Sequence, residues 1–247
     1  MNRELYQQPE LYDLIHAGFD EDIEFYAQVV GTGTVWELFA GSGRVTVPLA
    51  ERGATVTAVD ASPEMIAAGK RYAAERGDAA QRIEWIEDRL PGYWMENRFQ
   101  TVIAPLHSLS HILAPANVLV LLQQVYWSLV PGGRFAFAVH NPDPAVLSRD
   151  PEKIYKHAEY HDPGGDITVY QKSGYDTAEQ ILSLVWYIED REQTRSISYR
   201  LRMFFPEELV LLVTTIGFEI EHRFGWYDRR PLTGECGTQI LVCRRPD

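Results

Sequence analysis

Apolar residues in the first part of the chain follow two patterns that alternate along the sequence. Short apolar runs of strand length cover residues 35–39, 54–59, 82–86, 99–104 and 135–139. Several segments between these runs carry apolar residues at helical spacing, and the clearest begins at Pro115 and continues to Leu129. Strands that alternate with helices predict a parallel sheet with right-handed crossovers. Ligands of such sheets bind beyond the carboxyl ends of the strands.

Several expected helices have recognisable start signals, and one of them contains a proline. Two helices, over residues 4–15 and 20–30, are expected ahead of the first strand. Another follows Val45, and Pro48 within it is compatible with a helix only in the first turns. Ser62-Pro63-Glu64 is typical of a helix start, with serine as the N-cap residue and proline in the first helical position.

After Pro144 the apolar pattern changes to an alternation with period two. It is visible at residues 167–169, 182–188 and 197–203, with turn-rich pieces between them. This alternation predicts a meander of antiparallel strands. Pro206 begins another helix, and strands near 218–222 and 239–243 follow it. The meander is therefore expected to be an insertion, and a final hairpin is expected to complete the main sheet.

Composition narrows the class of protein. A chain of 247 residues, 45% of them hydrophobic, fits one large α/β domain with an insertion. The formal net charge of −12 disfavours a nucleic-acid partner, since nucleic-acid binders usually carry a basic face. The first residues lack the apolar core of a signal peptide, and the longest apolar run is too short to span a bilayer. A cytoplasmic protein without a membrane partner is therefore expected. Cys236 and Cys243 are the only cysteines, so no disulfide framework is expected.

The first strand ends in a glycine turn, Ala40-Gly41-Ser42-Gly43, and a helical pattern follows. Such a turn lets a ligand approach the backbone, and the helix start favours an anion or a polar group. A dehydrogenase fingerprint would need a third glycine where Thr46 stands. A P-loop would need a Gly-Lys-Ser/Thr ending, which the sequence lacks. The turn therefore indicates a nucleotide-type site of another kind.

Acidic residues accompany three successive predicted strands. Glu37 lies inside the first strand, Asp60 closes the second and Asp88 follows the third. A carboxylate in the position of Asp60 can accept hydrogen bonds from both hydroxyl groups of a ribose. A carboxylate in the position of Asp88 can accept a hydrogen bond from the exocyclic amine of adenine. This set fits an adenosyl ligand without a pyrophosphate.

These motifs resemble those of the class I S-adenosylmethionine-dependent methyltransferases. E-L-F-A-G-S-G-R, V-T-A-V-D-A-S-P-E-M and W-I-E-D occur in that family's order over about residues 34–141. Segments 12–15, 201–206, 227–232 and 239–242 resemble a bacterial subgroup that includes amino-sugar N-methyltransferases. Phe39-Ala40 departs from the family, which more often has glycine-cysteine there.

The resemblance implies a fold and a division of the chain. The expected fold is α/β, with a Rossmann-like, seven-stranded, mostly parallel, doubly wound sheet and an inserted antiparallel β-meander. Residues 1–33 would form an N-terminal helical lid, and residues 34–144 with 204–247 the S-adenosylmethionine-binding core. Residues 145–203 would form the inserted subdomain, which either covers the substrate or contacts the second subunit of a homodimer.

The resemblance also implies a set of cofactor residues. Four positions of the glycine turn and its strand, Glu37, Ala40, Gly41 and Gly43, would line the methionine end of the cofactor. Asp60 would hold the ribose, Ala61 and Met65 would flank the adenine, and Asp88 with Arg89 would face its amine edge. The remaining expected contacts are Phe39, Ser42, Arg44, Leu90, Pro105 and Leu106.

Two histidines are expected near the transferred methyl group. His107 and His140 lie at the ends of adjacent predicted strands. An amine must react in its neutral form and a hydroxyl must lose its proton, so a histidine there suits a base. Either residue can instead be a hydrogen-bonding part of the wall, and this second role is favoured for His140. His107 and His111 are four residues apart, but no third ligand accompanies them, and no metal is expected.

Other candidates for the acceptor site come from the lid, the meander and the last loop. The resemblance places Tyr12 over the cofactor as a tentative catalytic or substrate-binding residue, although it equally fits a core tyrosine. Arg200, Trp226 and Arg230 are candidate substrate contacts, because aromatic rings with a few arginines suit a planar or anionic small molecule.

The sequence as a whole predicts a methyltransferase that transfers a methyl group from S-adenosylmethionine to a nitrogen, ahead of an oxygen, of a small molecule. S-adenosylhomocysteine would be the second product. Three alternatives remain: a nucleic-acid or protein methyltransferase, an S-adenosylmethionine-binding protein with other chemistry, and an interaction protein without cofactor. Ala104-Pro105-Leu106-His107 lacks the Asn/Asp-Pro-Pro-Tyr/Phe pattern of amino-methylating nucleic-acid enzymes, which disfavours the first.

Overall fold

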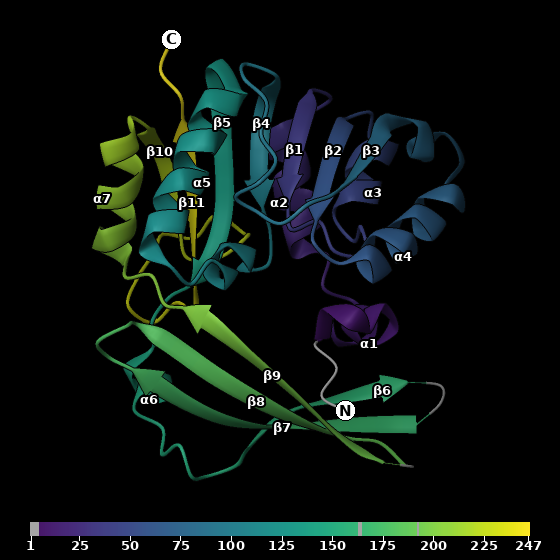
Figure 1. Ribbon diagram of the computed structural model, residues 1–247, viewed down its shortest axis with the longest axis vertical. Coiled ribbons are helices and arrows are strands. Elements are labelled where there is room, and N and C mark those ends of the chain that lie inside the picture. Colours follow the sequence, from purple (N-terminus) through teal and green to yellow (C-terminus); the bar gives the residue numbers. More distant parts are fainter. Residues whose placement is uncertain (1–4, 163–164, 192) are drawn as a thin grey trace.

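The computed structural model describes residues 5–162, 165–191 and 193–247 (Figure 1). Seven strands form the main sheet in the order β10-β11-β5-β4-β1-β2-β3. Their bounds are β1 Thr34–Leu38, β2 Thr55–Asp60, β3 Ile83–Glu87, β4 Phe99–Ala104, β5 Leu129–His140, β10 Glu219–Phe224 and β11 Thr238–Arg244. Neighbouring strands from β3 to β5 pair in parallel, whereas β11 pairs antiparallel with both β5 and β10. The predicted fold class is confirmed.

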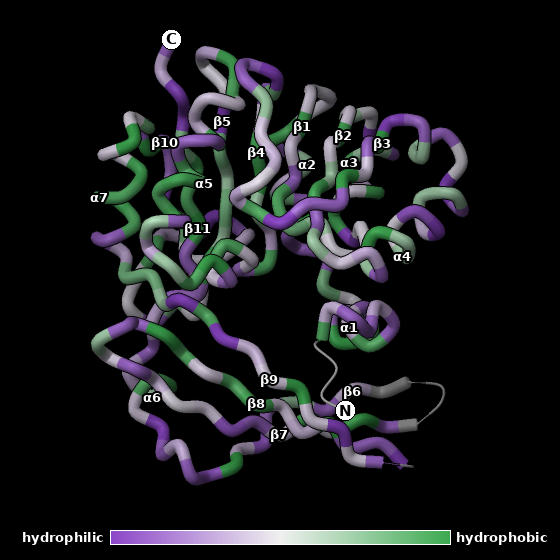
Figure 2. Tube along the Cα trace, viewed as in Figure 1, coloured by the Kyte–Doolittle hydropathy of each residue, from purple (hydrophilic) through white to green (hydrophobic). Residues whose placement is uncertain are grey.

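Helices pack on both faces of this sheet, and each face has its own apolar core (Figures 1 and 2). On one face, α5 (Pro115–Ser128) and α7 (Pro206–Ile216) pack against Trp36 and Phe135 of the sheet. On the other face, α2 (Glu21–Val30) and α3 (Thr46–Glu51) pack against the small side chains of Ala58 and Ala136. Two cores on one sheet make the architecture doubly wound. None of the described helices is long and apolar enough to cross a membrane.

The helix boundaries follow the signals in the sequence. Ser62 caps α4 (Pro63–Ala74), because its hydroxyl oxygen accepts a hydrogen bond from the Met65 amide at 3.2 Å. Pro48 is the third residue of α3, within the first turn, where backbone amides have no partner inside the helix. The proline is therefore tolerated without loss of a helical hydrogen bond.

The inserted sheet has four strands in the order β6-β7-β8-β9, one more than the pattern predicted. They are β6 Tyr155–Asp162, β7 Gly165–Asp176, β8 Ile181–Glu189 and β9 Thr194–Arg202, and all neighbours pair antiparallel. The sequence of β6, YKHAEYHD, has almost no apolar alternation. Because β6 is an edge strand with a bulge between Lys156 and Ala158, the periodicity did not reveal it.

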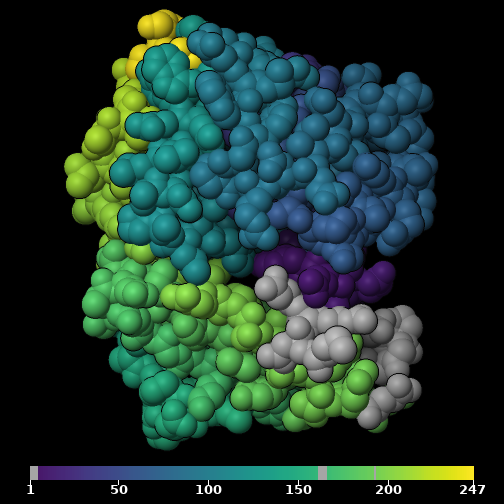
Figure 3. Space-filling model, viewed as in Figure 1, coloured from purple at the N-terminus to yellow at the C-terminus, as the bar shows by residue number. Residues whose placement is uncertain are grey.

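The N-terminal segment lies between the core and the inserted sheet (Figures 1 and 3). It contains a short 3-10 turn, Leu5–Gln7, and helix α1, Pro9–Ile15. Leu5 and Leu11 are buried in one cluster with apolar residues of the inserted sheet, including Val169 and Trp186. The N-terminal segment therefore connects the core to the inserted sheet, and these two parts enclose a space between them.

Candidate functional site

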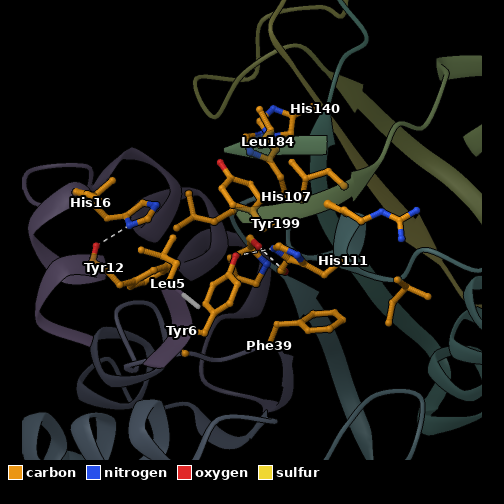
Figure 4. Close-up of a pocket in the computed structure, with 18 of the residues that line it drawn as sticks. Leu5, Tyr6, Tyr12, His16, Phe39, His107, His111, His140, Leu184 and Tyr199 are labelled. Atoms are coloured by element: carbon orange, nitrogen blue, oxygen red, sulfur yellow. Dashed lines mark hydrogen bonds between the residues drawn. The ribbon is translucent and has the colours of Figure 1, made fainter. Parts of the chain in front are cut away.

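A cavity of about 1260 Å³ lies between the main sheet, the N-terminal segment and the inserted sheet (Figure 4). Its walls include the turns after β1 and β2, the segments after β4 and β5, and side chains of β8 and β9. The carboxyl ends of parallel strands are the expected ligand site of this architecture. One continuous cavity thus joins the predicted cofactor site to the inserted sheet.

The glycine turn presents its backbone to the cavity. Phe39, Ala40 and Gly41 are lining residues, and Phe39 and Gly41 have positive φ values of 56° and 57°. A Cβ atom on Gly41 would meet Tyr12 Cε1 at 3.9 Å and no closer neighbour. Gly41 therefore leaves open space at the turn, and Tyr12 faces that space from α1.

Gly43 and Ser42 have structural roles and do not line the cavity. Gly43 has a φ of 83°, and a Cβ atom there would lie 2.8 Å from Trp85 Cη2. The Ser42 hydroxyl donates a hydrogen bond to Asp13 of α1 at 2.5 Å. Gly43 thus allows close packing behind the turn, and Ser42 ties the turn to the N-terminal helix.

Asp60 joins the glycine turn to the start of α4 and also lines the cavity. One carboxylate oxygen accepts the Gly41 amide at 2.8 Å, and the other accepts the Ser62 amide at 2.8 Å. Burial raises the pKa of Asp60, and the backbone amides oppose that rise. Each oxygen retains acceptor capacity, so the carboxylate is oriented and able to accept two hydroxyl groups.

Glu37 is a buried carboxyl group at the wall of the cavity, with 2% of the residue exposed. The Thr46 hydroxyl donates to one of its oxygens at 2.6 Å. Burial raises the pKa of Glu37 to about 8. A cation bound in the cavity would favour the ionised form, so the position suits a ligand ammonium group.

Arg44 lines the cavity beside the glycine turn. Its guanidinium forms an ion pair with Asp22 of α2 and donates to the Phe19 carbonyl oxygen at 2.6 Å. Asp22 is fully buried, so the pair anchors α2 against the turn. The Arg44 Nε is buried and has no hydrogen-bond partner among the described residues.

The cofactor residues predicted after β2 and β3 are placed in two ways. Ala61, Asp88, Arg89 and Leu90 line the cavity. The Asp88 amide donates to the Asp60 carbonyl oxygen at 3.0 Å, which brings the two acidic strand ends together. Met65 is fully buried and does not line the cavity. Pro105 and Leu106, after β4, are lining residues.

Several histidines belong to the polar wall of the cavity beyond the predicted cofactor residues. Among the described residues, five histidines line the cavity, at positions 16, 107, 111, 140 and 157. The structure brings His107 and His140 together: their rings stack with centroids 3.8 Å apart and planes 28° from parallel (Figure 4). Burial lowers the pKa of His107 well below its usual value and that of His140 to about 4. Both imidazoles are therefore neutral at physiological pH.

His107 is fixed by its backbone and by a neighbouring strand. Leu106 and His107 both have positive φ values, 49° and 60°, which non-glycine residues rarely adopt. The His107 Nε2 lies 3.1 Å from the hydroxyl oxygen of Thr238, a residue that pairs directly with His140 in the β5–β11 ladder. Thr238 thus holds the ring against its stacking partner, and Nδ1 is the ring nitrogen left for a ligand.

Two further aromatic pairs connect the N-terminal segment to the cavity (Figure 4). The Tyr6 hydroxyl lies 2.6 Å from His111 Nε2, and burial lowers the pKa of His111 to about 4. The rings of Tyr12 and His16 lie 4.2 Å apart, and His16 Nδ1 is 2.7 Å from the Tyr12 carbonyl oxygen. Burial raises the pKa of Tyr12, so its phenol stays protonated.

The predicted substrate residues are only partly brought together. Tyr12, His107, His140 and Arg200 line the cavity. Trp226 and Arg230 do not; Trp226 donates to Glu21 of α2, and Arg230 pairs with its neighbour Asp228. We therefore leave these two residues out of the proposed site.

Sequence reasoning missed several residues around the cavity, including Thr238 beside His107 and Tyr6 beside His111. Thr238 lies 131 positions from His107, and neither local spacing nor a motif connects them. The sequence signal for Tyr6 was equally absent, because its contact to His111 spans 105 positions. Only the folded arrangement of β11 and of the N-terminal segment reveals these contacts.

Comparisons with known proteins agree with the geometry. Residues 35–133 match a family model described as "Methyltransferase domain". The "Putative methyltransferase YqeM" of Bacillus subtilis (strain 168) is 24% identical over 223 residues, which cover 86% of this chain and 85% of that protein. These matches confirm the resemblance to methyltransferases that the sequence motifs indicated.

Solved structures show the same fold. The CcbJ methyltransferase from Streptomyces caelestis superposes with a TM-score of 0.81 at 24% identity, over 92% of this chain and 89% of that one. CalS10, an amino pentose methyltransferase from Micromonospora echinaspora solved with S-adenosylmethionine bound, gives a TM-score of 0.72 at 15% identity, over 99% and 98%. Both likenesses support the doubly wound core and the inserted sheet.

Proposed function

We propose that this chain, which carries a methyltransferase domain over residues 35–133, transfers a methyl group from S-adenosylmethionine to a nitrogen atom of a small molecule. One observation carries the proposal. A single cavity has an oriented acidic and glycine-rich site at one end and a stacked pair of neutral histidines at the other. Such an arrangement holds two reactants in line, which is the main requirement of a displacement at carbon.

The residues at the first end fit S-adenosylmethionine group by group. The two oxygens of Asp60 suit a ribose diol, and Glu37 suits the ammonium group of the methionine part. Arg44, which lines the cavity beside the glycine turn, suits its carboxylate, while Asp88 and Leu90 line the space expected for adenine. The cofactor supplies a methyl group on a positively charged sulfur, which is an electrophile at neutral pH.

The size of the cavity supports a second ligand. Pockets for one ligand usually enclose about 300–1,000 Å³. The volume of about 1260 Å³ exceeds that range and extends past His107 and His140 to the inserted sheet. We infer that a small-molecule acceptor occupies this part of the cavity together with the cofactor.

The histidine environment favours nitrogen over oxygen as the acceptor atom. Burial keeps the pKa of His140 near 4 and that of His107 below its usual value, so both are weak bases. A hydroxyl group needs a strong base before it attacks, whereas a neutral amine attacks through its own lone pair. The His107 Nδ1 can then accept a hydrogen bond from the amine and orient it toward the methyl group.

The segments around the cavity define proposed roles for the parts of the chain. Residues 1–33 act as a lid, since Tyr6 and Tyr12 line the cavity at its cofactor end. Residues 34–144 and 204–247 form the cofactor-binding core. We propose that residues 145–203 cover the acceptor, because Leu184 and Tyr199 of the inserted sheet face the same cavity. This role does not require a homodimer.

Methyl transfer with isotope-labelled S-adenosylmethionine tests the proposal. The protein is incubated with a panel of primary and secondary amines and the corresponding alcohols, and labelled products are identified by mass spectrometry. We expect S-adenosylhomocysteine to form together with an N-methylated product, and Asp60→Ala to suppress both. Methylated alcohols alone would contradict the choice of nitrogen. Cofactor binding without transfer to any acceptor would support an S-adenosylmethionine-binding protein of another kind.

A further inference from the structure

The inserted sheet gives the acceptor end of the cavity an apolar wall. Leu182 and Leu184 of β8 and Leu201 of β9 are lining residues, and each is only 5% exposed. They belong to one buried cluster that also contains Met203, another lining residue. In Figure 4, the side chain of Leu184 points toward the same part of the cavity as His107 and His140. An acceptor whose nitrogen approaches the histidines would place the rest of its structure against this wall.

Aromatic rings complete the wall. Trp186 and Tyr199 line the cavity with their rings edge to face, 5.3 Å between centroids. The Trp186 indole nitrogen already donates to Gln171 at 3.1 Å, so its polar atom is satisfied within the protein. Burial raises the pKa of Tyr199 and keeps its phenol neutral. These rings present flat, uncharged surfaces that suit an aliphatic or aromatic body.

Charged groups at this end are few and already have partners. Asp143 is the one carboxylate among the described lining residues beyond the cofactor end, and it is exposed and caps a short helix by accepting the Ala145 amide at 2.8 Å. The Arg200 guanidinium lies 3.5 Å from Glu179, and that of Arg149 lies 4.9 Å from the centre of the Tyr155 ring. The wall therefore offers no buried carboxylate for an ammonium ion, and its two guanidinium groups already contact a carboxylate and an aromatic ring.

We propose that the acceptor is an amine attached to an apolar or aromatic body, with the nitrogen at His107 and the body against Leu184, Trp186 and Tyr199. This inference rests on the proposed function and specifies its substrate class. A polyhydroxylated amine would lose hydration against the leucine side chains, which offer no polar atoms in exchange. An apolar body gains contact area at the same place.

Calorimetry on the full chain saturated with S-adenosylhomocysteine tests this class. The probes are phenylcyclohexylamine and D-glucosamine, which share a six-membered ring with an amino group, and affinities are compared for their neutral forms. We expect phenylcyclohexylamine to bind at least tenfold more tightly. Leu184→Asn should weaken that binding about tenfold, because an amide would meet the apolar body. The control Leu211→Asn changes a leucine of α7 that is 65% exposed and should leave binding unchanged.

The outcomes separate this inference from the proposed function. Equal or tighter binding of D-glucosamine, no binding of either amine to a protein that binds S-adenosylhomocysteine, or an unaffected Leu184→Asn variant would overturn the substrate class. Preferential binding of phenylcyclohexylamine without methyl transfer from S-adenosylmethionine would leave the apolar amine site standing and count against the proposed function alone.

Discussion

The contact between Thr238 and His107 makes a specific prediction about the acceptor site. Thr238 is 2% exposed, and its hydroxyl oxygen lies 3.1 Å from His107 Nε2. Thr238→Val removes this hydrogen bond while it keeps the branched shape of the side chain. Thr238→Ser keeps the hydroxyl group and is the matched control. We expect the valine variant, and not the serine variant, to release the orientation of the His107 ring.

The expected magnitude follows from the number of constraints on His107. A hydrogen bond of this kind contributes about 0.5–1.5 kcal/mol, equivalent to roughly a two- to tenfold change in an equilibrium. The positive φ values of Leu106 and His107 store about 1–3 kcal/mol each, which the surrounding contacts must offset. Loss of the hydrogen bond should therefore shift the equilibrium between orientations of the His107 ring by roughly two- to tenfold. It should also lower the midpoint of thermal unfolding by about 2–4 °C.

Nitrogen-15 NMR of histidine-labelled protein measures the ring directly. In the native protein we expect one His107 tautomer with Nε2 protonated and bonded to Thr238, which leaves Nδ1 as an acceptor for an amine. Thr238→Val should give a mixture of tautomers, and Thr238→Ser should resemble the native protein. A single unchanged tautomer in the valine variant would refute the positioning role, whatever the effect on stability.

Three further predictions follow from the same geometry. Asp60→Ala should weaken S-adenosylmethionine binding at least about tenfold in calorimetry, because two ribose acceptors are lost; unchanged affinity would remove Asp60 from the site. Gly41→Val should block binding in a folded protein, whereas Gly43→Ala should lower the unfolding temperature, since its Cβ would lie 2.8 Å from Trp85 at a positive φ. Because burial lowers the folded-state pKa of His140 from 6.5 to about 4, the unfolded state binds more protons in this range, and stability should fall as pH drops from about 6.5 to 4. His140→Gln should reduce that dependence in denaturant titrations.

Most of the fold could be predicted from the sequence, because its strands and helices carry strong local signals. The apolar runs predicted β1 to β4 within one residue at each end, whereas β5 begins at Leu129, six residues before the predicted start at Phe135. Ser62 marked the start of α4. β6 was missed because an exposed edge strand needs no apolar alternation, and its polar sequence resembles a loop. Apolar periodicity indicates which residues are buried. It therefore gives no signal where a strand is held mainly by backbone hydrogen bonds.

The candidate site also has one part that local sequence patterns predicted and another part that they did not. The proposed cofactor end depends on motifs in which residues lie close to a glycine turn or a strand end. Local spacing therefore predicted Asp60 and Gly41, and the structure brings both to the cavity. The acceptor end depends on contacts between distant segments, such as Thr238 with His107, which no local pattern encodes. Trp226 looked like a pocket residue by composition, but its ring packs on Phe19 near α2.

Binding of S-adenosylmethionine to the purified chain, measured by isothermal titration calorimetry beside the Asp60→Ala variant, tests the central claim most directly. The geometry of Glu37, Gly41 and Asp60 predicts saturable binding of one molecule per chain, weakened at least about tenfold in the variant. Absence of heat and of thermal stabilisation with both S-adenosylmethionine and S-adenosylhomocysteine would contradict it.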